Sequence, residues 1–310
     1  MATEFSVIVQ SEYGDPKRVL RIEKRQLKED ALGADDVLIH VITRPIHPGD
    51  IHMLSALPQG GPSHPIPEGQ LRIPGFEGVG RIVRMGSNAR ATQKLSEGQR
   101  VAFFPAHGAW GEYVTMRRTA VVPVPDEITD QVAAQMLINV ITATTLMRVG
   151  HHSLRTPVVP PTYILQNAAA SSVGRLLTQV ALDCGVRPIR LVRSVESAEK
   201  LQTVLPGPPV YSTSKSTWKE EVREALGSHK LEVAFDAVGG SAIDALADVV
   251  DEGGTVINFG SLGSNTGTNI YALVPKNVSL KSVSIMMIHV LKINKKARLF
   301  KRKENSHAYV

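Results

Sequence analysis

The sequence predicts an α/β protein of two domains, a partly open β-barrel followed by a doubly wound parallel sheet. The chain has 310 residues, which exceeds the usual size of a single hydrophobic core. Its first part contains short β-branched runs separated by turn residues, whereas its second part alternates strand and helix patterns. Hydrophobic residues at 43% and charged residues at 21% are close to the averages of folded globular proteins.

Residues 1–125 form the predicted barrel domain. Its β-branched runs alternate with Gly, Pro and Asn turns, a pattern typical of short strands. The runs are SVIVQ, DVLIHVI, GVGRIVRMG, RVAFF and EYVTM. Between the second and third runs, residues 57–74 are rich in proline, which predicts a long irregular loop of the kind that often borders a site.

Residues 126–288 form the predicted second domain. An amphipathic helical stretch over 130–150 opens it, and a Pro-rich crossing follows. Six strand patterns then alternate with helical or turn-forming sequence, which indicates a doubly wound parallel sheet. These strands are YILQNA, IRLVR, PVYST, EVAFDAV, GTVINFG and SVSIMMI.

The first of these strands runs through a tight turn into a helix that Gly185 can close. Small residues at such a turn let the backbone approach a pyrophosphate, and the helix N-terminus offers free amides and a partial positive charge. The predicted cradle consists of Ala170, Ser171, Ser172 and Gly174. Only Gly174 of the usual glycine fingerprint is present, so packing alone stays open as an alternative.

The second strand ends in Arg193 and Ser194, near the expected place of the adenosine ribose of a bound dinucleotide. A site for NAD normally has a carboxylate there. A cation and a hydroxyl instead complement a ribose phosphate, which favours NADPH over NADH. A solvated surface arginine is the alternative interpretation, and Glu196 keeps NADH open as a minor one.

Two later strands also end in small residues, within FDAVGG and VINFGSLG. They place Val238, Phe259, Gly260 and Ser261 at the carboxyl edge of the predicted sheet, where open α/β sheets bind ligands. Any one of these segments could be a simple turn. Three of them aligned on one edge favour a cofactor site.

Composition narrows the classes of function. The single cysteine, Cys184, can form neither an internal disulfide nor the paired thiolates of a structural zinc lobe. No apolar run reaches the roughly 20 residues that a membrane span requires. The first residues show neither a signal peptide nor a transit pattern, so we expect a cytoplasmic protein.

The formal charge of +6 is accounted for by seven Lys and Arg residues between Lys292 and Lys303. Segment 289–310 is basic and has no sustained apolar period, which predicts a disordered tail. It also lacks the aromatic residues that alternate with basic ones in nucleic-acid-binding surfaces. We therefore expect the partner to be a small-molecule substrate and not a nucleic acid.

At this point several motifs, in their order and spacing, resemble the medium-chain dehydrogenase/reductase family. Within it the chain is similar to the zinc-independent quinone reductases and the trans-2-enoyl-thioester reductases. The motifs are HPGDIHML, IPGFEGVGRIVRMGS, EGQRVAFF, GAWGEYV, MLINVITA, ILQNAAASSVG, FDAVGG and NFGSLG. The resemblance spans residues 5–288 and implies a GroES-like barrel domain joined to a Rossmann domain.

This resemblance implies that hydride passes from NADPH to the 2,3-double bond of an enoyl thioester of CoA or ACP, without a metal. NADPH:quinone reduction is one alternative, and a catalytically impaired NADPH-binding sensor or interaction protein is another. The resemblance implies cofactor contacts at Asn139, Ala170, Ser171, Ser172, Val173, Arg193, Ser194, Val195, Phe259, Gly260, Ser261 and Leu262. We expect Thr142, Gly174 and Val238 to belong to the same cofactor site.

Zinc-dependent members of the family use a Cys, a His with an adjacent Glu, and a third ligand. In this chain His47 stands at the first position, but Phe76 precedes Glu77 where a ligand His would be needed, and MLINV offers no third ligand. One imidazole and one carboxylate fall short of the three protein ligands of a usual catalytic zinc. We therefore expect no metal, and we interpret His47, His52 and His64 as loop and barrel residues.

The chain departs from the family at two places. The family's Tyr, which helps to polarise the thioester carbonyl, corresponds to Pro58, and loss of such a donor could lower the rate about 10²-fold or more. His52 and Ser55 are weak candidates to replace it, so the catalytic residue stays unknown. The second departure is the C-terminus, where the return segment that completes the barrel domain has no counterpart.

We expect this second departure to lower stability relative to full-length relatives, unless a partner compensates. The apolar run SVSIMMI is suited to edge-to-edge strand pairing, which predicts a homodimer. A mitochondrial location is the alternative to a cytoplasmic one, if another form of the chain carries a presequence.

Overall fold

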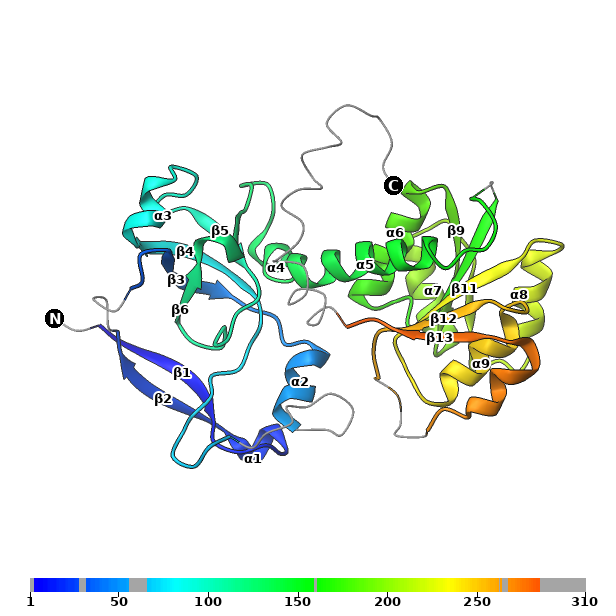
Figure 1. Cartoon of the computed structure of the whole chain (residues 1–310), viewed down its shortest axis with the longest axis horizontal. Helices are drawn as coiled ribbons and strands as arrows, with labels where there is room; N and C mark the ends of the chain where they lie inside the picture. The colour runs from blue at the N-terminus through cyan, green and yellow to red at the C-terminus, as the bar shows by residue number, and fades with distance from the viewer. Residues whose placement is uncertain are drawn as a thin grey trace. The chain divides into compact units, whose positions relative to one another are not determined.

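The protein divides into two compact units, Met1–Ile138 (unit 1) and Asn139–Val310 (unit 2), which are described separately (Figure 1). The structure is a computed structural model and describes residues 3–27, 32–55, 66–158, 161–261, 263 and 267–284. The division lies inside a helix, whereas the sequence places the domain boundary after residue 125. The physical reason is that Met136 and Leu137 still pack against the core of unit 1.

Unit 1 is built on antiparallel strands. A two-stranded ribbon pairs β1 (Glu4–Gln10) with β2 (Leu20–Gln26), and the short helix α1 (Pro16–Val19) lies between them in the chain. A five-stranded sheet has the order β6-β3-β4-β5-β7. Its strands are β3 (Asp36–Thr43), β4 (Gly78–Met85), β5 (Arg100–Phe103), β6 (Tyr113–Arg117) and β7 (Val121–Pro123). All five runs predicted as strands contain a strand, β1, β3, β4, β5 and β6.

Strand β2, LRIEKRQ, has no counterpart in the sequence prediction. Every one of its side chains is at least partly exposed, so no apolar alternation marks it. Its partner β1 supplies the buried side of the ribbon through Val7 and Val9. A strand with both faces near solvent is therefore detectable only from its pairing.

The core of unit 1 fixes the helix that follows β3. Ile39, Ile82 and Phe103, from three neighbouring strands, are fully buried, and Leu54 of α2 (Pro48–Ser55) joins them. The remaining short elements are α3 (Ser87–Ala91), η2 (Arg118–Ala120) and α4 (Asp130–Ala133). Because Leu54 anchors α2, the residues at the start of this helix are held beside the sheet.

Unit 2 contains a six-stranded parallel sheet in the order β10-β9-β8-β11-β12-β13. The strands are β8 (Thr162–Gln166), β9 (Val186–Val192), β10 (Val210–Ser212), β11 (Leu231–Asp236), β12 (Thr255–Asn258) and β13 (Ser279–Ser282). The chain starts in the middle of the sheet, moves to one side and then returns to fill the other. This confirms the predicted doubly wound topology.

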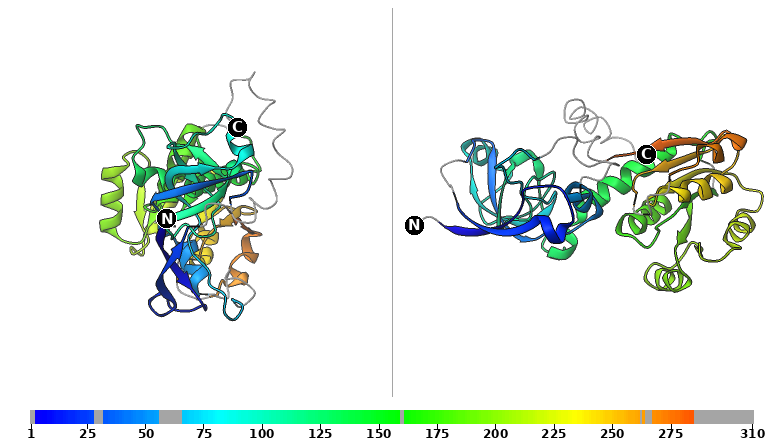
Figure 2. Two further views of the ribbon diagram at one scale, coloured as in Figure 1. Left: turned by 90° about the vertical axis from the view of Figure 1, so that its left-hand side faces the viewer. Right: turned by 90° about the horizontal axis from the view of Figure 1, so that it is seen from below.

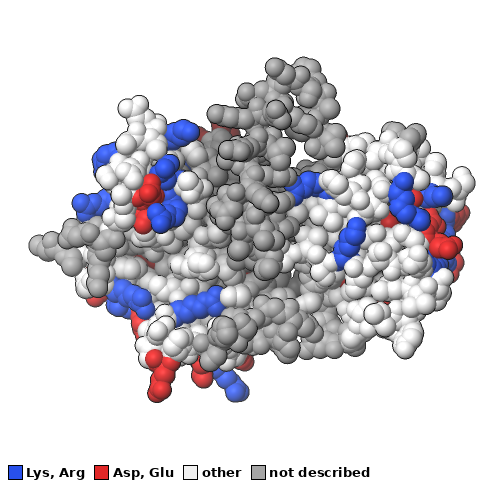
Figure 3. All heavy atoms as spheres, in the orientation of Figure 1, with Lys and Arg blue, Asp and Glu red and all other residues white. Residues whose placement is uncertain are grey.

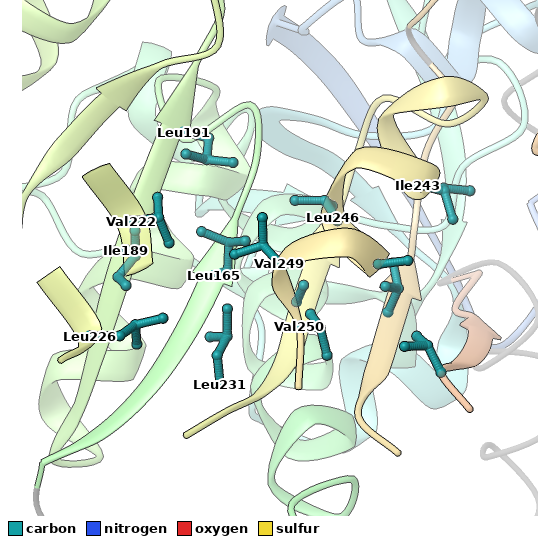
Figure 4. Packing of buried hydrophobic residues seen from close by; sticks show 14 of the residues in the cluster. Leu165, Ile189, Leu191, Val222, Leu226, Leu231, Ile243, Leu246, Val249 and Val250 are labelled. Atoms are coloured by element: carbon teal, nitrogen blue, oxygen red, sulfur yellow. The ribbon is translucent and has the colours of Figure 1, made fainter. Parts of the chain in front are cut away.

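Helices cover both faces of this sheet (Figures 1 and 2). On one face, Val222 of α8 (Trp218–Leu226) and Leu246 of α9 (Ser241–Val249) pack with Leu165 of β8, as Figure 4 shows. On the other face, α5 (Met136–His151) and α6 (Ser172–Asp183) pack on Ile164 and Phe235. The remaining elements are α7 (Val195–Val204), η3 (Ile270–Ala272) and η4 (Val274–Lys276). The predicted helical stretch 130–150 is thus two helices, α4 and α5.

The last strand begins earlier than SVSIMMI predicts. β13 spans Ser279–Ser282, because its register with β12 starts at Thr255↔Ser279. All four of its residues are exposed, and β13 forms one edge of the described sheet. The apolar residues 285–288 and the predicted basic tail, 289–310, lie outside the described residues.

The described surface carries charges of both signs. Figure 3 shows basic side chains in separate groups on the face it presents, with acidic side chains beside several of them. Within the described ranges, no helix is both long enough and apolar enough to cross a membrane.

Candidate cofactor site

The turn between β8 and α6 is shaped by close backbone contacts. Ser171 caps α6, and its Oγ accepts a hydrogen bond from the amide of Gly174 at 3.1 Å. A Cβ at Gly174 would lie 2.6 Å from the carbonyl oxygen of Ala168, so only glycine permits this approach. Ala168 adopts a φ of +47°, in the left-handed region that favours glycine. The predicted cradle, Ala170 to Gly174, therefore does form a tight turn that leads into a helix N-terminus.

Asp236, at the end of β11, holds three strand ends together. Its Oδ1 accepts hydrogen bonds from the side-chain amide of Asn167 and from the backbone amide of Val238, the latter at 3.1 Å. Its Oδ2 accepts from the amide of Gly239 at 2.9 Å and from Nδ2 of Asn258 at 2.6 Å. Asn167 follows β8, Val238 and Gly239 follow β11, and Asn258 ends β12, so one carboxylate fixes the carboxyl edge of three adjacent strands.

Sequence reasoning did not single out Asn167, Asp236 and Asn258. Their signal is a polar residue at or directly after the end of each buried strand, in LQNA, AFDA and VINF. Asp236 is fully buried and Asn167 is 8% exposed. Their polar atoms are therefore paired with hydrogen-bond partners in the protein and not with bulk water.

The segments after β11 and β12 come together as predicted. The amide of Gly263 donates to the carbonyl oxygen of Val238 at 2.8 Å. A Cβ at Gly260 would lie 2.8 Å from the carbonyl oxygen of Ala237, so this glycine is required by close approach. Phe259, Gly260 and Ser261 remain partly exposed at this edge, whereas Leu262 lies outside the described residues.

The end of β9 places Arg193 and Ser194 at the same edge of the sheet. The amide of Ala169 donates to the carbonyl oxygen of Leu191 at 3.0 Å, which ties the turn after β8 to β9. Ser194 caps α7 by accepting a hydrogen bond from the amide of Ser197 at 3.2 Å, and Val195 opens the helix. Arg193 is exposed, and no hydrogen bond or ion pair engages its guanidinium within the described part of the chain. A charged group is therefore available to an anion there.

The remaining predicted cofactor residues lie on α5. Asn139 and Thr142 are in its first two turns and are half-buried. The helix packs on the face of the sheet that α6 also covers, through Ala143 and Leu146.

The weak catalytic candidates of the sequence are on α2 in unit 1. His52 and Ser55 are half-buried in its last turns, and Pro58 lies outside the described residues. No described contact assigns either side chain a chemical role.

A more distinctive cluster surrounds the start of α2. Asp50 Oδ2 accepts a hydrogen bond from the amide of His47 at 3.0 Å and lies 3.5 Å from Nε2 of the same histidine. Burial raises the pKa of Asp50 to about 6 and lowers that of His47 to about 4. Burial, together with the charge of Asp50, raises the pKa of Glu77 to about 7. Sequence reasoning left Asp50 unnamed and interpreted His47 as a loop residue.

Comparisons with known protein families match both units. The model of the alcohol dehydrogenase GroES-like domain matches residues 33–126, and the model named zinc-binding dehydrogenase matches residues 172–300. The second match extends beyond residue 288, into the segment that the sequence predicts to be a disordered tail.

Individual relatives cover most of the chain. A mitochondrial enoyl-[acyl-carrier-protein] reductase of Caenorhabditis elegans is 27% identical over 286 residues, which is 90% of this chain and 78% of the relative. A solved structure from Bacillus thuringiensis, assigned as an NADPH:quinone reductase, is 26% identical with a TM-score of 0.77, covering 93% of this chain and 82% of that one. The complex of Etr1p with NADP and crotonyl-CoA superimposes with a TM-score of 0.78, over 94% of this chain and 85% of that one, and at 17% identity it shows the fold alone.

One of the matching family models is named for zinc binding, but the described residues do not fit a zinc site. Among the described residues, no group of three or more His, Cys, Asp or Glu side chains could hold a metal ion. The ring of His47 instead stacks on Phe76, with the ring centroids 5.8 Å apart. An aromatic side chain thus stands next to the imidazole.

Proposed function

Because this chain belongs to the medium-chain dehydrogenase/reductase family, we propose that it is an NADPH-dependent reductase of the 2,3-double bond of an enoyl thioester. The observation that carries the proposal is the carboxyl edge of the sheet in unit 2, where Asp236 fixes three turns beside the N-terminus of α6. When bound, NADPH supplies the hydride.

The residues of this edge fit a dinucleotide phosphate. Gly174 and Gly260 allow the backbone to approach a ligand, and the N-terminus of α6 complements a pyrophosphate. The guanidinium of Arg193, which has no partner among the described residues, and the hydroxyl of Ser194 suit the additional phosphate of NADPH. Asn139 and Thr142 on α5 remain proposed contacts of the same cofactor.

The substrate class follows from the relatives and from the chemistry of the reaction. The Caenorhabditis elegans relative is named for an enoyl group on acyl carrier protein, which supports a thioester of ACP or of CoA as substrate. Hydride adds to carbon 3 of the double bond and a proton adds to carbon 2, so the protein must also provide a proton. No step passes through a metal.

Quinone reduction is the second candidate, because the Bacillus thuringiensis protein is assigned to that reaction. A form that binds NADPH without turnover is the third candidate, since Pro58 stands where the family has its Tyr.

The proposal also includes a homodimer formed through the exposed edge strand β13. The proposed location is cytoplasmic or mitochondrial.

One titration separates these candidates. NADPH fluorescence is followed as purified protein is added, and crotonyl-CoA and then a quinone are added to the same cuvette. We expect binding, followed by loss of NADPH fluorescence upon addition of crotonyl-CoA. Loss with quinone alone identifies a quinone reductase, and binding without loss identifies the impaired form. Absence of binding to a folded sample contradicts all three.

A further inference from the structure

Asn167 and Asp236 lie where the strand order of unit 2 reverses. The sheet has the order β10-β9-β8-β11-β12-β13, so β8 and β11 are neighbours that begin its two halves. A dinucleotide binds across such a point, with one mononucleotide on each half of the sheet. Asn167 directly follows β8, and Asp236 ends β11. Their contact therefore joins the two halves of the proposed cofactor site at its middle.

The side-chain amide of Asn167 is used at both ends. Its Nδ2 donates to Oδ1 of Asp236, and its Oδ1 accepts a hydrogen bond from the amide of Ala237 at 2.8 Å. The reverse orientation would set an amide oxygen against a carboxylate and an NH₂ group against a backbone N–H, so these partners fix the orientation of the side chain. The backbone amide of Asn167 also donates to the carbonyl oxygen of Phe235 at 3.1 Å. Both its backbone and its side chain are thus bound to the end of β11.

The next residue, Ala168, has a strained backbone. Its φ of +47° lies in the left-handed region, which is disfavoured for alanine about 5- to 30-fold relative to the right-handed one. On its other side, Ala169 is fully buried, and its amide donates to the carbonyl oxygen of Leu191 on β9 at 3.0 Å. Ala168 therefore connects a residue held by β11 to a residue held by β9. Its conformation is imposed by these two neighbours.

The conformation of Ala168 shapes the turn that leads into α6. Its carbonyl oxygen accepts a hydrogen bond from the amide of Ser171 at 2.9 Å. The backbone of Gly174 passes so close that a Cβ there would lie 2.6 Å from the same oxygen. If Ala168 relaxed to an ordinary φ, this oxygen would turn away and the turn would open. Ala168 thus decides whether the N-terminus of α6 is presented to a pyrophosphate.

We propose that Asn167 is a positioning residue for NADPH. Its side-chain bonds to the end of β11 hold Ala168 in the left-handed conformation, which keeps the turn ready for the pyrophosphate before the cofactor binds. This inference rests on the proposed function. The apparent affinity for a ligand falls by the fraction of molecules in the competent conformation. Without the side-chain bonds, the preference of alanine leaves about one molecule in 5 to 30 competent, and NADPH binding weakens by that factor.

A double-variant cycle tests the link between the two residues. Asn167→Ala removes both side-chain bonds, and the dissociation constant for NADPH, measured by fluorescence titration, should rise about 5- to 30-fold. Glycine adopts the left-handed conformation without steric cost, so adding Ala168→Gly to Asn167→Ala should restore NADPH binding to within about threefold of the wild type. A loss that glycine does not restore overturns the inference, as does wild-type binding by Asn167→Ala.

A second substitution leaves the hydrogen bonds of Asn167 in place. A β-branched side chain is strongly disfavoured in the left-handed conformation, so Ala168→Val should weaken NADPH binding at least about 10-fold. Asn277→Val is the matched control, because Asn277 also has a left-handed backbone, with a φ of +50°, but precedes β13 at the amino edge of the sheet. It should lower the unfolding midpoint and leave NADPH binding unchanged. If Ala168→Val binds NADPH like the wild type, the inference fails.

A ligand without a pyrophosphate separates positioning from loss of structure. Adenosine 2′-phosphate carries the phosphate that is proposed to bind at Arg193, but no pyrophosphate. Its dissociation constant, measured by NMR titration, should change by less than about twofold in Asn167→Ala and in Ala168→Val. Equal weakening of adenosine 2′-phosphate and NADPH means that the substitutions damage unit 2 as a whole, which overturns the positioning role. Absence of NADPH binding to the folded wild-type protein instead overturns the proposed function.

Discussion

The carboxyl edge of the sheet in unit 2 and the start of α2 in unit 1 both contain buried carboxyl groups. The two regions differ in how many hydrogen bonds the carboxyl group receives. At the edge, Asp236 receives four hydrogen bonds, two on each carboxylate oxygen. At the start of α2, Asp50 keeps one oxygen unpartnered among the described residues, and its pKa is raised to about 6. A fully bonded carboxylate is suited to fix geometry, whereas a partly bonded one is suited to exchange protons.

The largest expected effect comes from removing the fully bonded carboxylate. Asp236→Ala leaves the side-chain amide of Asn167 and the backbone amides of Val238 and Gly239 without that acceptor, and we expect unfolding to become easier by on the order of 4 kcal/mol. Thermal and urea unfolding measure this change. The control is Asp248→Ala, a half-exposed carboxylate paired with Lys219, which should cost about 1 kcal/mol or less. Equal losses in the two variants would contradict the proposed role of Asp236.

Gly174→Ala should act on ligand binding more than on the rest of unit 2. The new Cβ would lie 2.6 Å from the carbonyl oxygen of Ala168, which forces the turn to move by overpacking and costs about 1–3 kcal/mol. We expect NADPH affinity to fall at least about 10-fold, measured by fluorescence titration. Gly267→Ala is the control, since a Cβ there meets open space. If both variants bind NADPH like the wild type, the turn is not a cofactor cradle.

Arg193→Gln separates the two dinucleotides. A charge-assisted contact to the additional phosphate contributes to NADPH binding and not to NADH binding. We expect the dissociation constant for NADPH to rise about 10- to 100-fold and that for NADH to change little. Arg187→Gln, at the other end of β9 and exposed, serves as a control for loss of one positive charge from the same unit. If Arg193→Gln weakened the binding of NADPH and of NADH equally, Arg193 would not contact the additional phosphate.

Glu77→Gln tests the titratable side of the comparison through stability. In the unfolded chain Glu77 releases its proton near the ordinary pKa of 4.5, and in the folded protein near about 7. Between these values the folded state binds more protons, so stability contributed by Glu77 is present below pH 4.5 and is lost as pH rises through 7.

The glutamine variant does not titrate at this position. Its free energy of unfolding relative to the wild type should therefore rise between pH 4.5 and 7, by on the order of 1–3 kcal/mol. Parallel urea unfolding series of both proteins measure this difference, in which the opposite contribution of His47 largely cancels. A difference that is constant with pH would contradict a raised pKa for Glu77.

The sequence predicts the strands, the helices and their order better than it predicts the side chains of the candidate sites. Periodicity and turn residues locate most strands and the turn before α6, because those signals are local. Strand β2 is not predicted because it is exposed on both faces. The last strand is predicted too late in the chain because SLKS lacks an apolar pattern. Both errors come from weak local sequence patterns, whereas the predicted topology is correct.

The site residues divide in the same way. Ser171, Gly174 and Arg193 are found because each ends a recognisable strand or begins a helix. The network of Asn167, Asp236 and Asn258 requires the strand order, and the electrostatic effect of Asp50 on Glu77 acts between residues 27 positions apart in the chain. Only the folded structure supplies such non-local neighbours.

Isotope transfer can test whether the protein moves hydride from NADPH to carbon 3 of an enoyl thioester. The protein is incubated with crotonyl-CoA and NADPH that carries deuterium at both positions of nicotinamide carbon 4, and the acyl product is examined by NMR. We predict one deuterium at carbon 3 of butyryl-CoA, with a solvent-derived hydrogen at carbon 2. A product without deuterium at carbon 3, or no product while NADPH remains bound, would contradict it.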